Sequence, residues 1–67
     1  MPGRSIRKQL ISQARQAVEH IDRLDEILYD MAGRAGGRQP AIDEMAPMMI
    51  EGHEAIRSLW IALRSRL

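Results

Sequence analysis

The chain has no cysteine and no phenylalanine, and Tyr29 and Trp60 are its only aromatic residues. Without cysteine it can form no disulfide, thiolate nucleophile or cysteine-ligated zinc site. It also lacks an apolar run near the roughly 18 residues that a membrane span needs. Residues 1–15 are basic but hold no continuous apolar stretch, which argues against a signal peptide. The sequence therefore predicts a soluble, cytoplasmic protein with no membrane partner.

The apolar residues that are present, mainly Ile, Leu, Met and Ala, recur with helical spacing. From Leu10 to Ala35 they follow alternating steps of four and three, and a second such series runs from Ile42 to Leu63. Between them lies Gly33-Arg34-Ala35-Gly36-Gly37-Arg38-Gln39-Pro40, a segment that ends one helix and begins another. We predict one all-α domain over residues 1–67, with helices at about 5–35 and 40–66 and a turn at 36–39. Pro47 is expected to kink the second helix or to mark its true start.

Folding the chain at Gly36–Gly37 gives an antiparallel, coiled-coil-like hairpin in which facing residue numbers sum to about 73. Small residues then face large ones: Ala17 faces Ile56, and Gly52 faces Ile21. The predicted core within the hairpin is Leu10, Ala14, Ala17, Ile21, Leu24, Leu28, Met31, Ile42, Met45, Met49, Gly52, Ile56, Leu59 and Leu63.

Two helices cannot enclose a core, and chains of this length seldom bury enough apolar surface to be stable alone. A further set of residues flanks the two apolar series and would stay exposed on a lone hairpin. We therefore predict self-association, as a homodimer, into a four-helix bundle. The residues predicted for self-association or for contact with a partner are Ile11, Val18, Ile27, Met48, His53, Trp60 and Leu67.

The charged residues are sorted along the chain, although the net charge is only +1. Segments 1–18 and 55–67 contain no acid, whereas every Asp and Glu lies between residues 19 and 54. A hairpin would then carry about +7 at one end and about −6 at the other. The basic end either contacts phosphate or an acidic partner, or pairs with the acidic end of a second copy. Its residues are Arg4, Arg7, Lys8, Arg15, Arg57, Arg64 and Arg66.

The sequence contains no recognisable catalytic motif. No serine–histidine–aspartate grouping is evident, and the glycine-rich segment lacks the Lys-Ser/Thr of a phosphate-binding loop. His20 and His53 would lie at one level of the hairpin, but Glu51 and His53 are two residues apart and point to different sides of a helix. We expect no enzyme activity, cofactor, metal or small-molecule substrate.

These features favour a small non-catalytic interaction module, namely an adaptor, inhibitor or regulator that dimerises and binds another protein. One alternative is a nucleic-acid-binding regulator that uses the basic end. Another is a metal-binding four-helix bundle, in which histidines and carboxylates of the two copies form one site.

Overall fold

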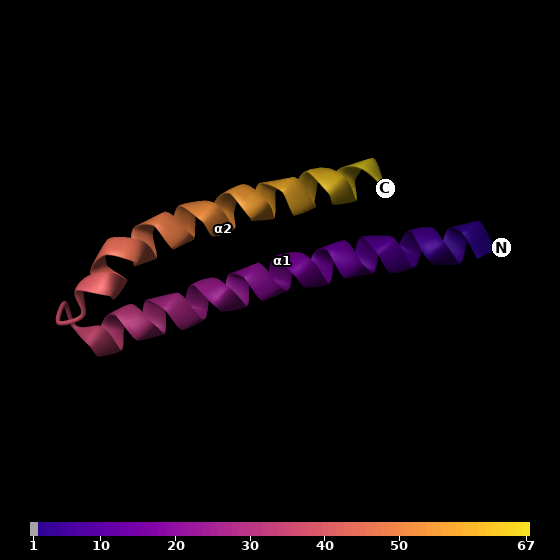
Figure 1. The fold of residues 1–67 in the computed structure, drawn as a ribbon. Helices are drawn as coiled ribbons and strands as arrows, with labels where there is room; N and C mark the ends of the chain where they lie inside the picture. Colours follow the sequence, from indigo (N-terminus) through magenta and orange to yellow (C-terminus); the bar gives the residue numbers. More distant parts are fainter. Residues whose placement is uncertain (1) are drawn as a thin grey trace.

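The protein, described here by a computed structural model, folds as two long α-helices joined by a short turn. The structure describes the backbone of residues 2–67 and the side chains of residues 6–67. Helix α1 spans Pro2–Ala35 and helix α2 spans Pro40–Arg66. The helices run antiparallel, so that both termini lie at one end of the molecule, here named the open end (Figure 1). The opposite end is named the turn end. The prediction of an all-α helical hairpin is confirmed.

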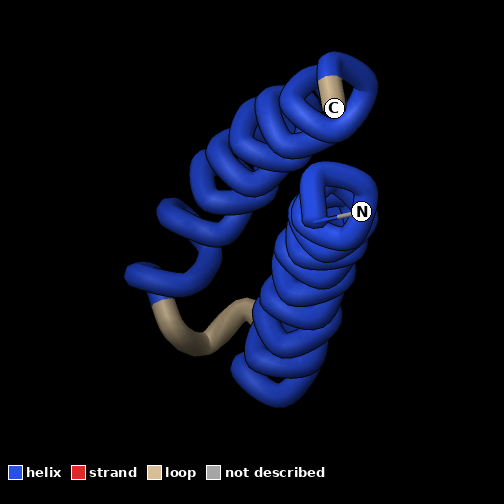
Figure 2. The backbone as a smooth tube through the Cα atoms, turned by 90° about the vertical axis from the view of Figure 1, so that its right-hand side faces the viewer, coloured by secondary structure: helices blue, strands red, loops and turns tan. Residues whose placement is uncertain are grey.

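The turn follows from two adjacent glycines. Gly36 and Gly37 have φ values of 57° and 75°, in the left-handed region that ends a helix at low steric cost. The Gly36 N–H still donates to the Ala32 carbonyl at 3.1 Å, and the Arg38 N–H donates to the Ala35 carbonyl at 3.0 Å. The chain therefore reverses within four residues, and Figure 2 shows this short loop bridging the ends of the two helices.

Helix α2 begins at Pro40, where the missing N–H is harmless because first-turn amides have no partner within the helix. Gln39 precedes it in an extended conformation, and its carbonyl accepts from the N–H groups of Ile42 and Asp43 at 3.1 Å. The helix continues through Pro47 without interruption. A proline inside a helix removes one backbone hydrogen bond and bends the axis, and the first turns of α2 bend relative to the rest in Figure 1.

The core of the hairpin is small. Among the described side chains, those of Ala14, Ile21, Leu28 and Ala35 are the buried apolar ones, and all four belong to α1. Helix α2 contributes no buried residue. Neither helix, along the part that the structure describes, is apolar over a length that could cross a bilayer.

The register of the two helices differs from the predicted one. Asp25 contacts His53, whereas facing numbers that sum to 73 would place Met48 opposite Asp25. The shift is therefore about five residues along α2, or roughly 7 Å at 1.5 Å per residue. Two features account for it. The turn is centred beyond Gly37. Because α2 bends near Pro47, additional residues of α2 precede the part that packs alongside α1.

This shift overturns two contacts expected from the sequence. Gly52 does not pack on Ile21, since a Cβ atom built at Gly52 would meet nothing within 4 Å. His20 and His53 do not share a level, because His53 lies beside Asp25, five residues along α1 from His20.

The predicted core of the hairpin agrees with the structure only in part, mainly on α1. Ala14, Ile21 and Leu28 are buried, and Ala17 and Ile42 are half-buried, but the other predicted core residues are exposed. Leu59 is the extreme case, with 71% of its surface exposed. Conversely, four residues assigned to self-association are half-buried in the hairpin: Ile11, Val18, His53 and Leu67. The exposed members of the predicted core are Leu10, Leu24, Met31, Met45, Met49, Gly52, Ile56, Leu59 and Leu63.

Both helices are thus rotated about their axes relative to the prediction. The physical reason is visible in the seam of α2, whose half-buried side chains include the polar residues His53 and Arg57. These residues contact acidic partners on α1, and their position in the seam leaves Met49, Ile56 and Leu63 of α2 facing outward.

Candidate functional site

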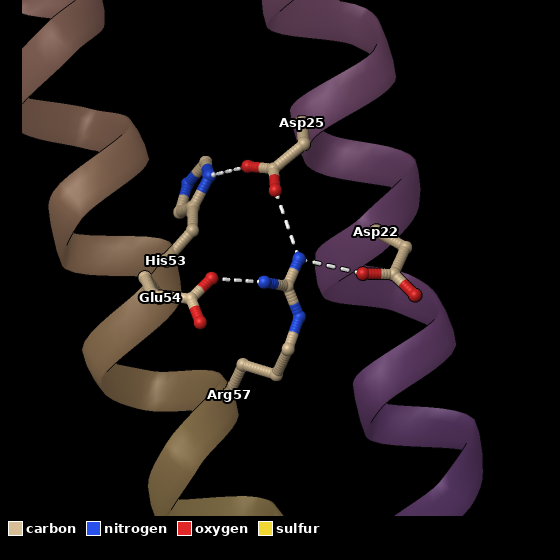
Figure 3. A network of polar contacts seen from close by, with 5 residues as sticks. All are labelled: Asp22, Asp25, His53, Glu54 and Arg57. Carbon is tan, nitrogen blue, oxygen red and sulfur yellow. Dashed lines mark hydrogen bonds and ion pairs between the residues drawn. The ribbon is translucent and has the colours of Figure 1, made fainter.

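A network of five polar side chains joins the two helices near the middle of the hairpin (Figure 3). We call this group the polar network; its members are Asp22 and Asp25 of α1 and His53, Glu54 and Arg57 of α2. The side chains of Asp25, His53 and Arg57 are only 17–19% exposed, whereas those of Asp22 and Glu54 are more than half exposed. The network therefore has a shielded centre and a solvated rim.

Arg57 lies at the centre of the network and contacts three carboxylates. Its Nη2 donates to Asp25 Oδ2 at 2.9 Å and to Asp22 Oδ1 at 2.6 Å, and its Nη1 donates to Glu54. The hydrogen bond to Asp25 raises the pKa of the Arg57 guanidinium further above its usual range. Arg57 is therefore a cross-link between the helices, not a free member of the basic end as the sequence suggested.

Asp25 binds His53 through its other oxygen. The distance from His53 Nδ1 to Asp25 Oδ1 is 2.6 Å. The hydrogen bond from His53, assisted by the one from Arg57, lowers the pKa of the Asp25 carboxyl below its ordinary value. Asp25 is then ionised at neutral pH and can only accept, so the Nδ1 atom of His53 carries the hydrogen.

A histidine oriented by an aspartate is also the arrangement that activates a nucleophile in many hydrolases. Here His53 lines a groove whose other walls are Leu24, Ile27, Leu28, Met31 and Met49. These side chains offer no hydroxyl or thiol group for the histidine to activate. Within the described part of the chain, no three His, Cys, Asp or Glu side chains are grouped so as to hold a metal ion. The geometry of the polar network is that of a clamp between helices.

The second candidate site is an apolar face on one side of the hairpin. The groove beside His53 brings Leu24, Ile27 and Met31 of α1 together with Met49 of α2. A larger groove, of about 540 Å³, lies toward the open end between Leu10 and Ala14 of α1 and Trp60, Leu63 and Leu67 of α2.

Both grooves lie on the same side, because Met49 and Leu63 are separated by two heptads with Ile56 midway between them. We call this surface the apolar face and define it by Leu10, Leu24, Ile27, Met31, Met49, Ile56, Leu59 and Leu63, each of which is 41–71% exposed. None of these residues is charged.

The remaining residues predicted for contacts fall into two groups. Trp60 lines the larger groove and Ile27 the smaller one, while Met48 is exposed at 56%. Of the predicted basic residues, the side chain of Arg4 lies outside the described part. Arg7, Lys8, Arg15 and Arg66 are exposed and Arg64 is half-buried. In the part of the chain with described side chains, none of these five forms an ion pair.

Sequence reasoning missed the polar network. From the sequence, His53 was assigned to the self-association surface and Arg57 to the basic end. A usable signal was present, because His53 and Arg57 stand four residues apart and so share one side of a helix. Their common partner could not be identified without the correct register.

Comparison of the sequence with protein-family models and with curated proteins, and of the fold with solved structures, finds no match to this chain.

Proposed function

We propose that this protein is a non-catalytic interaction module that self-associates through its apolar face into a four-helix bundle and acts as an adaptor, inhibitor or regulator of another protein. The observation that carries the proposal is that α2 contributes no buried residue, although its apolar side chains line one side of the hairpin. The packing of such a helix on α1 alone buries little apolar surface and so contributes little to stability. An uncharged surface of Leu, Ile and Met is stabilised most when another protein covers it.

A second copy of the chain suits this surface in shape and length. Exposed apolar side chains extend along α2 from Met49 to Leu63 and along α1 from Leu10 to Met31. A partner that covers this face must present an apolar surface of comparable length, and a second hairpin presents such a surface. Two hairpins related by a twofold axis would each bury this face and form a four-helix core. The charged side chains would remain outside, available to a further protein.

The experiment compares two isoleucines that have nearly equal exposure but lie on different sides of α2. Ile56 is 47% exposed on the apolar face, while Ile61 is 42% exposed and stands one heptad after Glu54, on the side of the polar network. We expect wild-type protein to sediment at twice the chain mass. Ile56→Asp should sediment as a folded monomer, whereas Ile61→Asp should keep the wild-type mass.

Circular dichroism of both variants would show that the helices persist. A wild-type protein that stays monomeric at high concentration would overturn the proposal of self-association. Equal dissociation of both variants would mean that the apolar face is not the contact surface.

A further inference from the structure

The environments of Arg57 and Arg64 differ sharply, although the two residues occupy equivalent positions in the hairpin. Arg64 stands one heptad after Arg57 on α2, and Arg15 stands one heptad before Asp22 on α1. Because the helices are antiparallel, both displacements lead about 10 Å toward the open end. Arg57 contacts Asp22 across the seam at 2.6 Å, so the same geometry places Arg15 opposite Arg64.

At the positions one heptad closer to the open end, apolar residues stand in place of the other two carboxylates that surround Arg57. Val18 takes the position equivalent to Asp25, and Ile61 takes the position equivalent to Glu54. Arg64 is nevertheless half-buried, and it forms no ion pair with the residues that the structure describes. By this geometry a half-buried arginine stands at a position opposite a second arginine, whereas its counterpart Arg57 has three acidic partners.

Among the described side chains, no ion pair neutralises either arginine of this pair. Segments 6–18 and 58–67 hold no Asp or Glu, and Arg7, Lys8 and Arg66 add further positive charge at the open end. The nearest acid along α1 is Glu19, one turn from Arg15, and no ion pair links the two. A cation near the C-terminus of α2 is favoured by the helix dipole, but that effect does not explain a cation at Arg15, in the middle of α1.

We propose that Arg15 and Arg64 form a phosphate-binding site between α1 and α2. A bound phosphate would supply the negative charge that the carboxylates of Asp22, Asp25 and Glu54 supply to Arg57. A phosphate group is suited to it because its several oxygens accept hydrogen bonds from two guanidinium groups at once, and arginine forks match that geometry. Lys8 stands one heptad before Arg15 on the same side of α1 and extends the positive surface, so that a ligand with more than one phosphate gains a further contact. The site lies on the side of the polar network, away from the apolar face.

Trp60 provides a direct probe, because it is the only tryptophan and stands one turn before Arg64 on α2. Its fluorescence would be followed at constant ionic strength while inorganic pyrophosphate is added, and anisotropy would be followed with a labelled duplex oligonucleotide. Four proteins would be compared: wild type, Arg15→Gln, Arg64→Gln and the control Arg23→Gln. Arg23 is an exposed arginine of α1 that already pairs with Glu26, so its replacement removes the same charge elsewhere.

We expect Arg15→Gln and Arg64→Gln each to weaken binding by about fivefold or more, and Arg23→Gln to leave it nearly unchanged. Binding of pyrophosphate supports a site for small phosphate compounds, and binding of the oligonucleotide alone supports a site for a phosphodiester backbone. Binding of neither probe, or equal weakening in all three variants, would overturn the site. The folded monomer Ile56→Asp should bind as wild type does, so this test is independent of self-association.

Discussion

The two sides of the hairpin seam are built on different principles. On one side Asp22, Asp25 and Arg57 join the helices through charge-assisted hydrogen bonds, whereas on the other side apolar groups of both helices lie exposed next to each other. The polar side is complete within one chain, because each charge of the network has a partner. The apolar side is incomplete, since leaving such groups in water gains nothing from the hydrophobic effect. The difference shows that a hairpin can fix its own register with charges and keep its apolar groups for another molecule.

The largest expected effect comes from placing a charge in the seam between these two sides. Ile21 is 7% exposed, so Ile21→Asp would bury an unpaired carboxylate that the structure cannot solvate. That cost exceeds the few kcal/mol that a small helical domain has to spare. We expect loss of the helical circular dichroism signal, whereas Ile56→Asp changes only the mass in solution. A folded Ile21→Asp monomer would contradict the assignment of Ile21 to the core.

The next largest effect is the difference in stability between variants of the two equivalent arginines, Arg57 and Arg64. Arg57→Gln leaves the carboxylates of Asp22, Asp25 and Glu54 close together without their cation, so we expect a clearly lower melting temperature. Arg64→Gln removes the positive charge that the inferred site places opposite Arg15 and should stabilise the fold slightly, by about a few tenths of a kcal/mol. Thermal melts in phosphate-free buffer at one protein concentration would measure both. Two changes of the same sign would show that the environments of the arginines do not differ as described.

A smaller effect is expected on the stability of the fold at low pH. Because the folded protein lowers the pKa of Asp25 below its ordinary value of 3.8, the ionised form favours the folded state. This contribution is fully present above the unfolded pKa and is lost as pH falls through the folded pKa. Urea unfolding between about pH 6 and about pH 2 should therefore show stability that declines below about pH 4.

Asp25→Asn should be less stable at neutral pH and should decline less across the same window. The control Glu19→Gln replaces an exposed acid that has no ion pair in the described part, and it should follow the wild-type curve. If Asp25→Asn declines as steeply as wild type, the interaction of Asp25 with His53 and Arg57 does not stabilise the folded state.

The sequence predicted the two helices and the turn because those features depend on local chemistry. Heptad spacing, the left-handed glycines and Pro40 each act within a few residues. The packing could not be predicted in the same way, because it depends on the relative rotation and register of the helices. Pairing the apolar series of both helices seemed best when judged by hydrophobicity alone. The Asp25–His53 and Asp22–Arg57 contacts select another register, and their energy depends on distances that no periodic pattern encodes.

The smallest predicted effect separates the packing within one hairpin from the packing between two. A Cβ atom at Gly33 or at Gly52 would meet nothing within 4 Å in the single chain. In an isolated hairpin each Gly→Ala change should therefore stabilise its helix by about 0.5–1 kcal/mol, since alanine has the better helix propensity. Gly52 stands one heptad before Leu59, at the edge of the apolar face, whereas Gly33 stands one heptad after Glu26, on the outer surface of α1.

Both changes would be measured by urea unfolding in wild type and in the monomeric Ile56→Asp background. We expect Gly33→Ala to give the same gain in both, and Gly52→Ala to give its full gain only in the monomer, because a second copy approaches that edge. If Gly52→Ala destabilises the monomer itself, Gly52 packs against α1, and the register that pairs it with Ile21 is the correct one.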